Sequence, residues 1–216
     1  MKVESCTILH YGMSYISYAL RSVYDQMDAL HVVYTPRPSH GHGTSKICPD
    51  SEADLMGAAL SVGPKVHWHT VDRFSQEGEH RDYALSLCNN ADLVLVLDCD
   101  EIWDPGVLDD ALKMAWDGSA ATWRLEFRTP WRSFNWLCTD DMRPDRIQDQ
   151  RGGRHGRWGY LPPEWDIWHF GYAVPSKILR YKIEIHGHLN EWRDNWYEEK
   201  WKPWPPVKDV HPTCVG

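Results

Sequence analysis

The feature that most constrains the fold is the regular alternation of apolar runs with amphipathic segments over the first hundred residues. Apolar and β-branched runs predict strands at residues 6–10, 30–35, 65–70 and 93–97. Apolar residues at helical spacing predict helices at residues 16–27, 50–60 and 79–89. This β-α-β-α-β-α-β order implies an α/β protein whose central sheet is mostly parallel and flanked by helices. Ligands of such sheets bind beyond the carboxyl ends of the strands.

The second half of the chain is less regular. Asp104 is expected to cap a fourth helix, with Pro105 in its first turn and an inner face of Leu108, Ala111, Leu112 and Ala115. Residues 120–128 are expected to form a strand and residues 131–137 its hairpin partner. After residue 137 the pattern weakens. Residues 143–157 are rich in Arg and Gly, residues 177–185 predict either a helix or a strand, and residues 201–216 predict an irregular tail. We therefore expect a single domain over residues 1–216, with an irregular, Trp-rich C-terminal half.

Composition narrows the class of protein. With 42% apolar and 25% charged residues, the chain is neither disordered nor fibrous. It contains no apolar stretch of roughly 18–20 residues, and its start (MKVESC) predicts no signal peptide. Six cysteines without a Cys-x-x-Cys pair argue against a zinc ribbon or a disulfide scaffold, and they fit a reducing cytoplasm. The expected location is therefore cytoplasmic, without a membrane partner.

Net charge and tryptophan content lead to different expectations about nucleic-acid binding. The formal charge of −8 lowers the expectation of nucleic-acid binding without removing it. The chain has 13 Trp, of which 12 lie from Trp103 onward. Their rings either stack on sugars and bases or fill the core.

The segment LVLVLDCDEIWDP at residues 93–105 carries the strongest chemical signal. A strand that is apolar throughout delivers Asp98, Asp100 and Glu101 to the expected ligand edge. Residues two apart on an extended chain point the same way, so Asp98 and Asp100 can share one site. Close carboxylates repel one another, and a divalent cation with oxygen ligands, Mg²⁺ or Mn²⁺, neutralises them. The alternative is that these residues only form a turn and a helix cap.

The stretch RDYALSLCNNADLVLVLDCDE at residues 81–101 resembles the centre of a GT-A-type, family-2-like glycosyltransferase. In that family an Arg-Asn pair on a helix precedes an apolar strand and then an Asp-x-Asp motif. This chain has Arg81-Asp82 in place of Arg-Asn. The resemblance implies that Asp98 meets the nucleotide or sugar and that Asp100 holds the metal. It also makes residues 1–128 the nucleotide-sugar-binding half and residues 129–216 the acceptor-side half.

A second match lies downstream. Trp168-His169, followed by Lys182 and His186, resembles the C-terminal pattern of some of these transferases. There a histidine commonly completes the metal shell, and imidazole suits Mn²⁺-class ions. We expect His169 to be that ligand ahead of His186 and His188, although a packed aromatic residue is an equally ordinary role. The family's acidic residue after the second strand is missing here. Asp72, after the third strand, is expected to replace it in nucleotide binding, and Arg81 is a further candidate for that role.

The arginines at 143–157 leave three interpretations open: contacts to the donor diphosphate, contacts to a nucleic-acid backbone, or a solvated, partly ion-paired loop. Compact transferases of this type also occur in phages, where some glycosylate hydroxymethylated pyrimidines in DNA. The resemblance thus makes modified DNA one candidate acceptor. The predicted acceptor-binding residues are Arg151, Arg154, Trp158 and Trp165.

The leading hypothesis is a metal-dependent hexosyl- or pentosyltransferase that moves a sugar from a nucleotide sugar, expected to be a UDP-sugar, to a hydroxyl acceptor. If configuration inverts, Glu164 and Asp166 are the nearest candidates for the base that deprotonates the acceptor. Two alternatives are a nucleotidyltransferase and a non-catalytic nucleotide-sugar-binding module. The first would need a Gly-rich, basic loop after the first strand, and the second would not need both Asp98 and Asp100.

Overall fold

The structure is a computed structural model of the 216-residue chain, and it describes residues 1–39, 44–138, 142–152, 157–185 and 195–203. A seven-stranded sheet has the order β10-β6-β9-β4-β1-β2-β3. Its strands are β1 (Val3–Leu9), β2 (Ala29–Tyr34), β3 (Val66–Thr70), β4 (Leu93–Val96), β6 (Thr122–Arg124), β9 (Asp145–Asp149) and β10 (Trp158–Tyr160). All neighbouring strands are parallel except at β9, which runs antiparallel to both β4 and β6. The predicted mostly parallel α/β sheet is confirmed.

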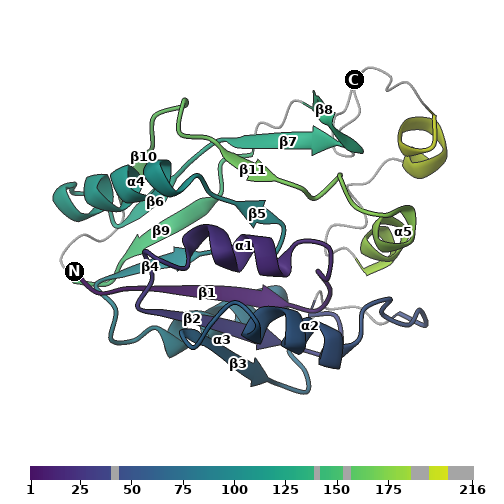
Figure 1. Cartoon of the computed structure of the whole chain (residues 1–216), viewed down its shortest axis with the longest axis horizontal. Coiled ribbons are helices and arrows are strands. Elements are labelled where there is room, and N and C mark those ends of the chain that lie inside the picture. Colours follow the sequence, from purple (N-terminus) through teal and green to yellow (C-terminus); the bar gives the residue numbers. More distant parts are fainter. Residues whose placement is uncertain (40–43, 139–141, 153–156, 186–194, 204–216) are drawn as a thin grey trace.

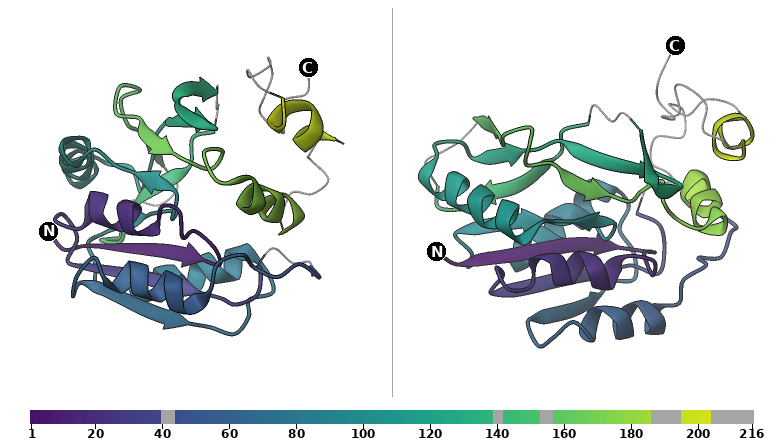
Figure 2. Two further views of the ribbon diagram at one scale, coloured as in Figure 1. Left: turned by 45° about the vertical axis from the view of Figure 1, so that its right-hand side comes forward. Right: turned by 45° about the horizontal axis from the view of Figure 1, so that its top comes forward.

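A second, four-stranded sheet has the order β5-β11-β7-β8. It consists of β5 (Glu101–Ile102), β7 (Phe127–Trp131), β8 (Ser133–Cys138) and β11 (Ile167–His169). Strands β7, β8 and β11 lie together on one side of β1, β2 and β3, and α1 (Ile16–Val23) packs near β5, as Figures 1 and 2 show. The short strand β5 directly follows the turn after β4, so the two sheets meet where the carboxylates are.

Helices cover both faces of the large sheet. Helices α1, α2 (Glu52–Leu60) and α4 (Pro105–Asp117) contribute to one apolar core with the strands. Helix α3 (Glu77–Leu87) packs on the opposite face against a smaller core that includes Cys6, Val33, Cys88 and Val96. The remaining helices are α5 (Ser176–Ile185) and a π-helical turn, η2 (Tyr197–Trp201). Within the described ranges no helix is long and apolar enough to cross a membrane.

Helix α4 forms where its local sequence signals predict it. Asp104 accepts hydrogen bonds from the amides of Gly106 and Val107, Pro105 opens the helix, and all four predicted inner residues are buried. Helix α2 is capped differently. Ser51 caps it by accepting a hydrogen bond from the Asp54 amide.

One prediction of local structure is wrong. Residues 120–128 do not form one strand, because β6 and β7 belong to different sheets. Strand β9, which the sequence does not predict, lies in the Arg-rich segment and inserts into the middle of the large sheet. The open choice at 177–185 resolves as the helix α5, and most of the predicted C-terminal tail lies outside the described residues.

Tryptophan mainly fills the interior in the second half. Five of these residues are at most 8% exposed: Trp103, Trp123, Trp131, Trp196 and Trp201. Trp158, at 62% exposed, is one of the few whose ring faces solvent.

Candidate functional site

The candidate site is the turn that follows β4. All four residues of β4 are buried, and the chain then turns so that the Glu101 amide donates to the Asp98 carbonyl at 3.1 Å. The Phe170 amide, just after β11, donates to the Asp100 carbonyl at 2.8 Å. The turn is therefore held from both sheets, and the side chains of Asp98, Asp100 and Glu101 diverge from a fixed backbone.

Glu101 and Asp98 share a buried guanidinium. Arg146 of β9 is 5% exposed, and its Nε donates to both carboxylate oxygens of fully buried Glu101 at 3.0 and 2.9 Å. Its Nη2 lies 2.7 Å from Asp98 Oδ2. Burial raises the pKa of Glu101 to about 7 against the lowering effect of Arg146, and the charge of Asp98 adds to the rise.

Asp98 has a second cationic partner. Arg81 of α3 lies with Nη1 3.4 Å from Asp98 Oδ1 and is itself held by Glu77 one turn earlier, at 2.7 Å. Burial acts to raise the pKa of Asp98, but the charges of Arg146 and Arg81 outweigh it and hold that pKa well below its usual range. Asp98 is therefore an ionised carboxylate with a guanidinium on each oxygen.

Asp100 faces a different set of groups. His169 Nε2 and Lys182 Nζ each lie 3.9 Å from Asp100 Oδ2, and the His169 ring stacks on Phe127. These distances are too long for hydrogen bonds and leave room between the donor atoms. A carboxylate and an imidazole suit a Mn²⁺-class ion, so Asp100 and His169 fit such an ion better than Asp98, whose oxygens already have cationic partners.

Two glycines, Gly171 and Gly12, leave room for the side chains around Asp100 and Cys99. A Cβ at Gly171 would lie 2.8 Å from His169 Nε2 and 2.9 Å from Lys182 Nζ. A Cβ at Gly12 would lie 2.6 Å from Cys99 Sγ, and Gly12 has a φ of +147°. Asp50 holds the Gly12 turn by accepting from the amides of Gly12 and Met13 at 2.9 and 3.0 Å. The turn after β1 thus packs directly against the one after β4.

The ends of β2 and β3 complete the edge. Thr35 Oγ1 donates to the backbone carbonyls of Arg37 and Asp72 at 3.0 and 3.4 Å, which ties the two strand ends together. The exposed side chains of Arg37 and Asp72 lie 3.9 Å apart. Asp72 is therefore at the ligand edge, as predicted, and its contact to a nucleotide stays a prediction.

A cavity of about 470 Å³ opens beside Asp98 on the α3 side of the sheet. Four arginines line it: Arg81, Arg124, Arg143 and Arg146. Each has a carboxylate partner, because Arg124 pairs with Asp145 and Arg143 with Glu126. Arg143 and Arg146 of the Arg-rich segment therefore belong to separate ion pairs, and Arg146 is buried within a strand.

Three of the four predicted acceptor residues lie in the described part of the chain, and each has different neighbours. Arg151 pairs with Asp149 at 2.6 Å and stacks on Trp116, while Trp165 packs against the main core. Trp158 is exposed, with the Arg124 guanidinium 4.2 Å from its ring centroid. Arg154, His186 and His188 lie outside the described residues.

The two predicted bases also differ in their surroundings. Asp166 pairs with Arg128 at 2.9 Å, and Glu164 is exposed. The sequence includes Arg146 among the arginines at 143–157 but does not predict its pairing with Asp98 and Glu101. The available signal was the excess of carboxylates at the turn, since buried carboxylates need a cation.

Comparison with solved structures identifies the fold. The chain is similar to S. aureus TarS 1–349, with a TM-score of 0.54 and 13% identity over 79% of this chain and 61% of that one. A longer TarS structure gives a TM-score of 0.52 and 12% identity over 79% of this chain and 37% of that one. These neighbours are GT-A glycosyltransferases, and the chain has their fold.

Other comparisons are weaker. Glucosyl-3-phosphoglycerate synthase from Mycobacterium tuberculosis, solved with Mg²⁺ and UDP, has a TM-score of 0.44 and 16% identity over 59% of this chain and 44% of that one. The chain thus spans less than two thirds of the length of each of these structures. No protein-family model matches its sequence, and no curated protein matches it.

Proposed function

We propose that the chain is a metal-dependent glycosyltransferase that moves a sugar from a nucleotide sugar, expected to be a UDP-sugar, to a hydroxyl acceptor. The observation that carries this proposal is the pair Asp98 and Asp100 at the carboxyl end of β4, with cationic groups arranged differently around each. The shared fold and the UDP and UDP-GlcNAc present in TarS 1–349 crystals agree with it.

In this proposal Asp100 and His169 hold a Mn²⁺ or Mg²⁺ ion. The ion would neutralise the donor diphosphate and stabilise the charge of the leaving nucleotide. Lys182 lies within 3.9 Å of Asp100 and adds a positive charge at the same place. Arg81 and Arg146 keep Asp98 ionised and oriented, so that it can accept hydrogen bonds from the hydroxyl groups of the nucleotide or sugar.

Hydrolysis or transfer from UDP-glucose and UDP-N-acetylglucosamine, followed by mass spectrometry with and without Mn²⁺, tests the proposal. Asp100→Asn should abolish the metal-dependent reaction, while the exposed Asp109→Asn on α4 serves as the matched control. An Asp100→Asn protein with full activity would contradict the assignment. So would a wild type that shows no turnover with any nucleotide sugar and no stabilisation by Mn²⁺ plus UDP.

A hydroxymethylated pyrimidine in DNA is one candidate acceptor within this proposal. The exposed rings of Trp158 and Tyr160, each faced by an arginine, support it because bases stack on such surfaces. The net charge of −8 weighs against it. A donor and acceptor screen that includes hydroxymethylated DNA, glycans and small alcohols distinguishes the acceptors.

A further inference from the structure

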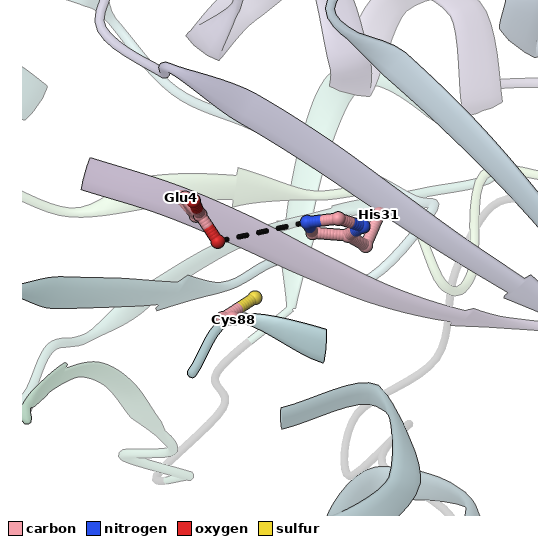
Figure 3. A group of neighbouring side chains, drawn as sticks. All are labelled: Glu4, His31 and Cys88. Carbon is pink, nitrogen blue, oxygen red and sulfur yellow. Dashed lines mark ion pairs between the residues drawn. The ribbon is translucent and has the colours of Figure 1, made fainter. Parts of the chain in front are cut away.

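A second group of metal-ligating side chains lies far from the turn after β4. Glu4 of β1, His31 of β2 and Cys88 at the C-terminal end of α3 each offer one ligand atom, and these atoms all lie within 4.8 Å of one another. Figure 3 shows the Glu4 and His31 side chains directed toward each other, with the Cys88 sulfur beside them. Glu4 pairs in register with Val94, four residues before Asp98, which is roughly 13 Å away along the strand direction.

Glu4, His31 and Cys88 are largely buried, but Glu4 and His31 are not close enough to form a hydrogen bond with each other. Glu4 is 5% exposed on a central strand of the sheet, and Cys88 is 1% exposed. Lys2 reaches Glu4 Oε1 at 2.6 Å from the protein surface, while Oε2 is directed toward His31. A buried carboxylate oxygen requires a positive or hydrogen-bonding partner, yet Glu4 Oε2 and His31 Nε2 are 3.6 Å apart, longer than a hydrogen bond.

The contact that His31 makes through Nδ1 leaves the lone pair of its Nε2 available to a metal ion. His31 Nδ1 lies 3.2 Å from His69 Nε2, at hydrogen-bonding distance. When Nδ1 carries the ring proton and donates it to His69, the Nε2 lone pair faces Glu4 and Cys88. Metal-bound histidines have this arrangement.

A fourth donor lies next to these three. Cys6 is two residues after Glu4 on β1, so both side chains point to the same face of the sheet, and Cys6 is aligned with His31 across the strands. Cys6 and Cys88 belong to the same buried cluster on the α3 side of the sheet. A bound cation would displace the Cys88 proton to solvent.

We propose that Glu4, His31 and Cys88 bind a Zn²⁺-class ion, with Cys6 or water in the fourth position. Thiolate, imidazole and carboxylate together are a zinc donor set, and a thiol excludes Mg²⁺ and Ca²⁺ as preferred ions. Ligand atoms around a tetrahedral zinc are separated by roughly 3.3–3.8 Å, given bonds of about 2.0–2.3 Å. The three ligand atoms lie within 4.8 Å of one another, so binding of the ion would draw them closer together.

The site would join three elements of the fold. Zinc would tie the C-terminal end of α3 to β1 and β2, and α3 carries Arg81 near its middle. The proposed ion is therefore structural and separate from the ion at Asp100. Its existence does not depend on the proposed transferase activity.

Cobalt titration of the untagged, EDTA-treated protein tests this site, because Co²⁺ bound to thiolate gives an intense near-ultraviolet absorption band. We expect one equivalent of Co²⁺ to produce the band, Zn²⁺ to abolish it, and one or two protons to be released per ion. Cys88→Ser should lose the band, and His31→Gln should bind Zn²⁺ at least about tenfold more weakly.

Two cysteine variants are matched controls. Cys99→Ser removes the thiol between Asp98 and Asp100, and Cys138→Ser removes a buried thiol of β8; both should keep the band. If Cys88→Ser does not fold, the partly exposed His31→Gln decides. A wild type without the thiolate band overturns the proposal, as does a band that disappears in Cys99→Ser and persists in Cys88→Ser.

Discussion

Arg146 and Glu101 form a buried ion pair in which a single guanidinium nitrogen donates to both carboxylate oxygens, across 45 residues of sequence. The pair joins β9, the antiparallel strand in the large sheet, to the first strand of the second sheet. Because Arg146 also contacts Asp98, the position of one strand determines the orientation of two carboxylates at the candidate site.

Replacing Arg146 should be strongly destabilising. Arg146→Met retains much of the side-chain volume but leaves Glu101 and Asp98 buried without their shared cation, which should cost about 3–5 kcal/mol of unfolding free energy. Urea unfolding at pH 8 measures this. Arg124→Met, which removes a more exposed pair with Asp145, is the matched control and should change stability little. Equal losses in the two variants would contradict the role assigned to Arg146.

Glu101 should give the protein a pH-dependent stability near neutrality. Its pKa is about 7 in the folded protein and about 4.3 unfolded, so the folded state retains a proton that the unfolded state releases. Stability should therefore fall as pH rises from about 4.5 to 7, by up to roughly 3 kcal/mol. Asp98 has the opposite sign, since its pKa is lowered, and its contribution is lost only below about pH 4.

The Glu101→Gln variant isolates that effect. It should flatten the dependence of unfolding free energy on pH between 5 and 7, because Gln does not titrate. Urea midpoints at several pH values, for wild type and variant in one buffer series, provide the measurement. Parallel curves for the two proteins would show that Glu101 is ionised throughout this range.

Gly171 should matter for activity more than for stability. In Gly171→Ala the new methyl group would come within 3 Å of His169 Nε2 and Lys182 Nζ, the ends of two side chains that can move aside. We expect thermal stability to change little, while the apparent Mn²⁺ affinity and donor turnover both fall by about tenfold or more. Gly57→Ala on α2, where nothing lies within 4 Å of the added Cβ, is the control. A variant with wild-type metal dependence would remove His169 from the metal site.

The sequence predicts the first hundred residues well because each element there carries its own local signal. The strand at 93–97 is apolar throughout, and the helix after Asp104 has its cap, its proline and its apolar face within 12 residues. Such patterns need no knowledge of the neighbouring elements. The same pattern predicts the position of Asp98 and Asp100 at the end of this apolar strand, because they directly follow it in sequence.

Strand β9 shows where local patterns fail. Its sequence, DRIQD, has one apolar residue, and its buried Arg146 is compatible with a strand only because Glu101 and Asp98 lie opposite. The split between β6 and β7 is equally invisible, because apolar residues continue through Leu125 and Phe127 while the chain passes from one sheet to the other. Both features depend on contacts between distant segments, which no local window contains.

The acceptor prediction depends on Trp158. If DNA is the acceptor, a base stacked on this ring should be worth about 1–3 kcal/mol, so Trp158→Ala should weaken DNA binding at least about fivefold and leave donor hydrolysis unchanged. Trp136→Ala, which removes another partly exposed ring on β8, is the matched control. The salt dependence of binding should have a slope near −0.9 per phosphate contact on duplex DNA. Arg151→Ala should leave that slope unchanged, because Asp149 already neutralises Arg151. A wild-type protein that does not bind hydroxymethylated DNA at low salt would exclude DNA as the acceptor, and the donor assay would still report on the transferase itself.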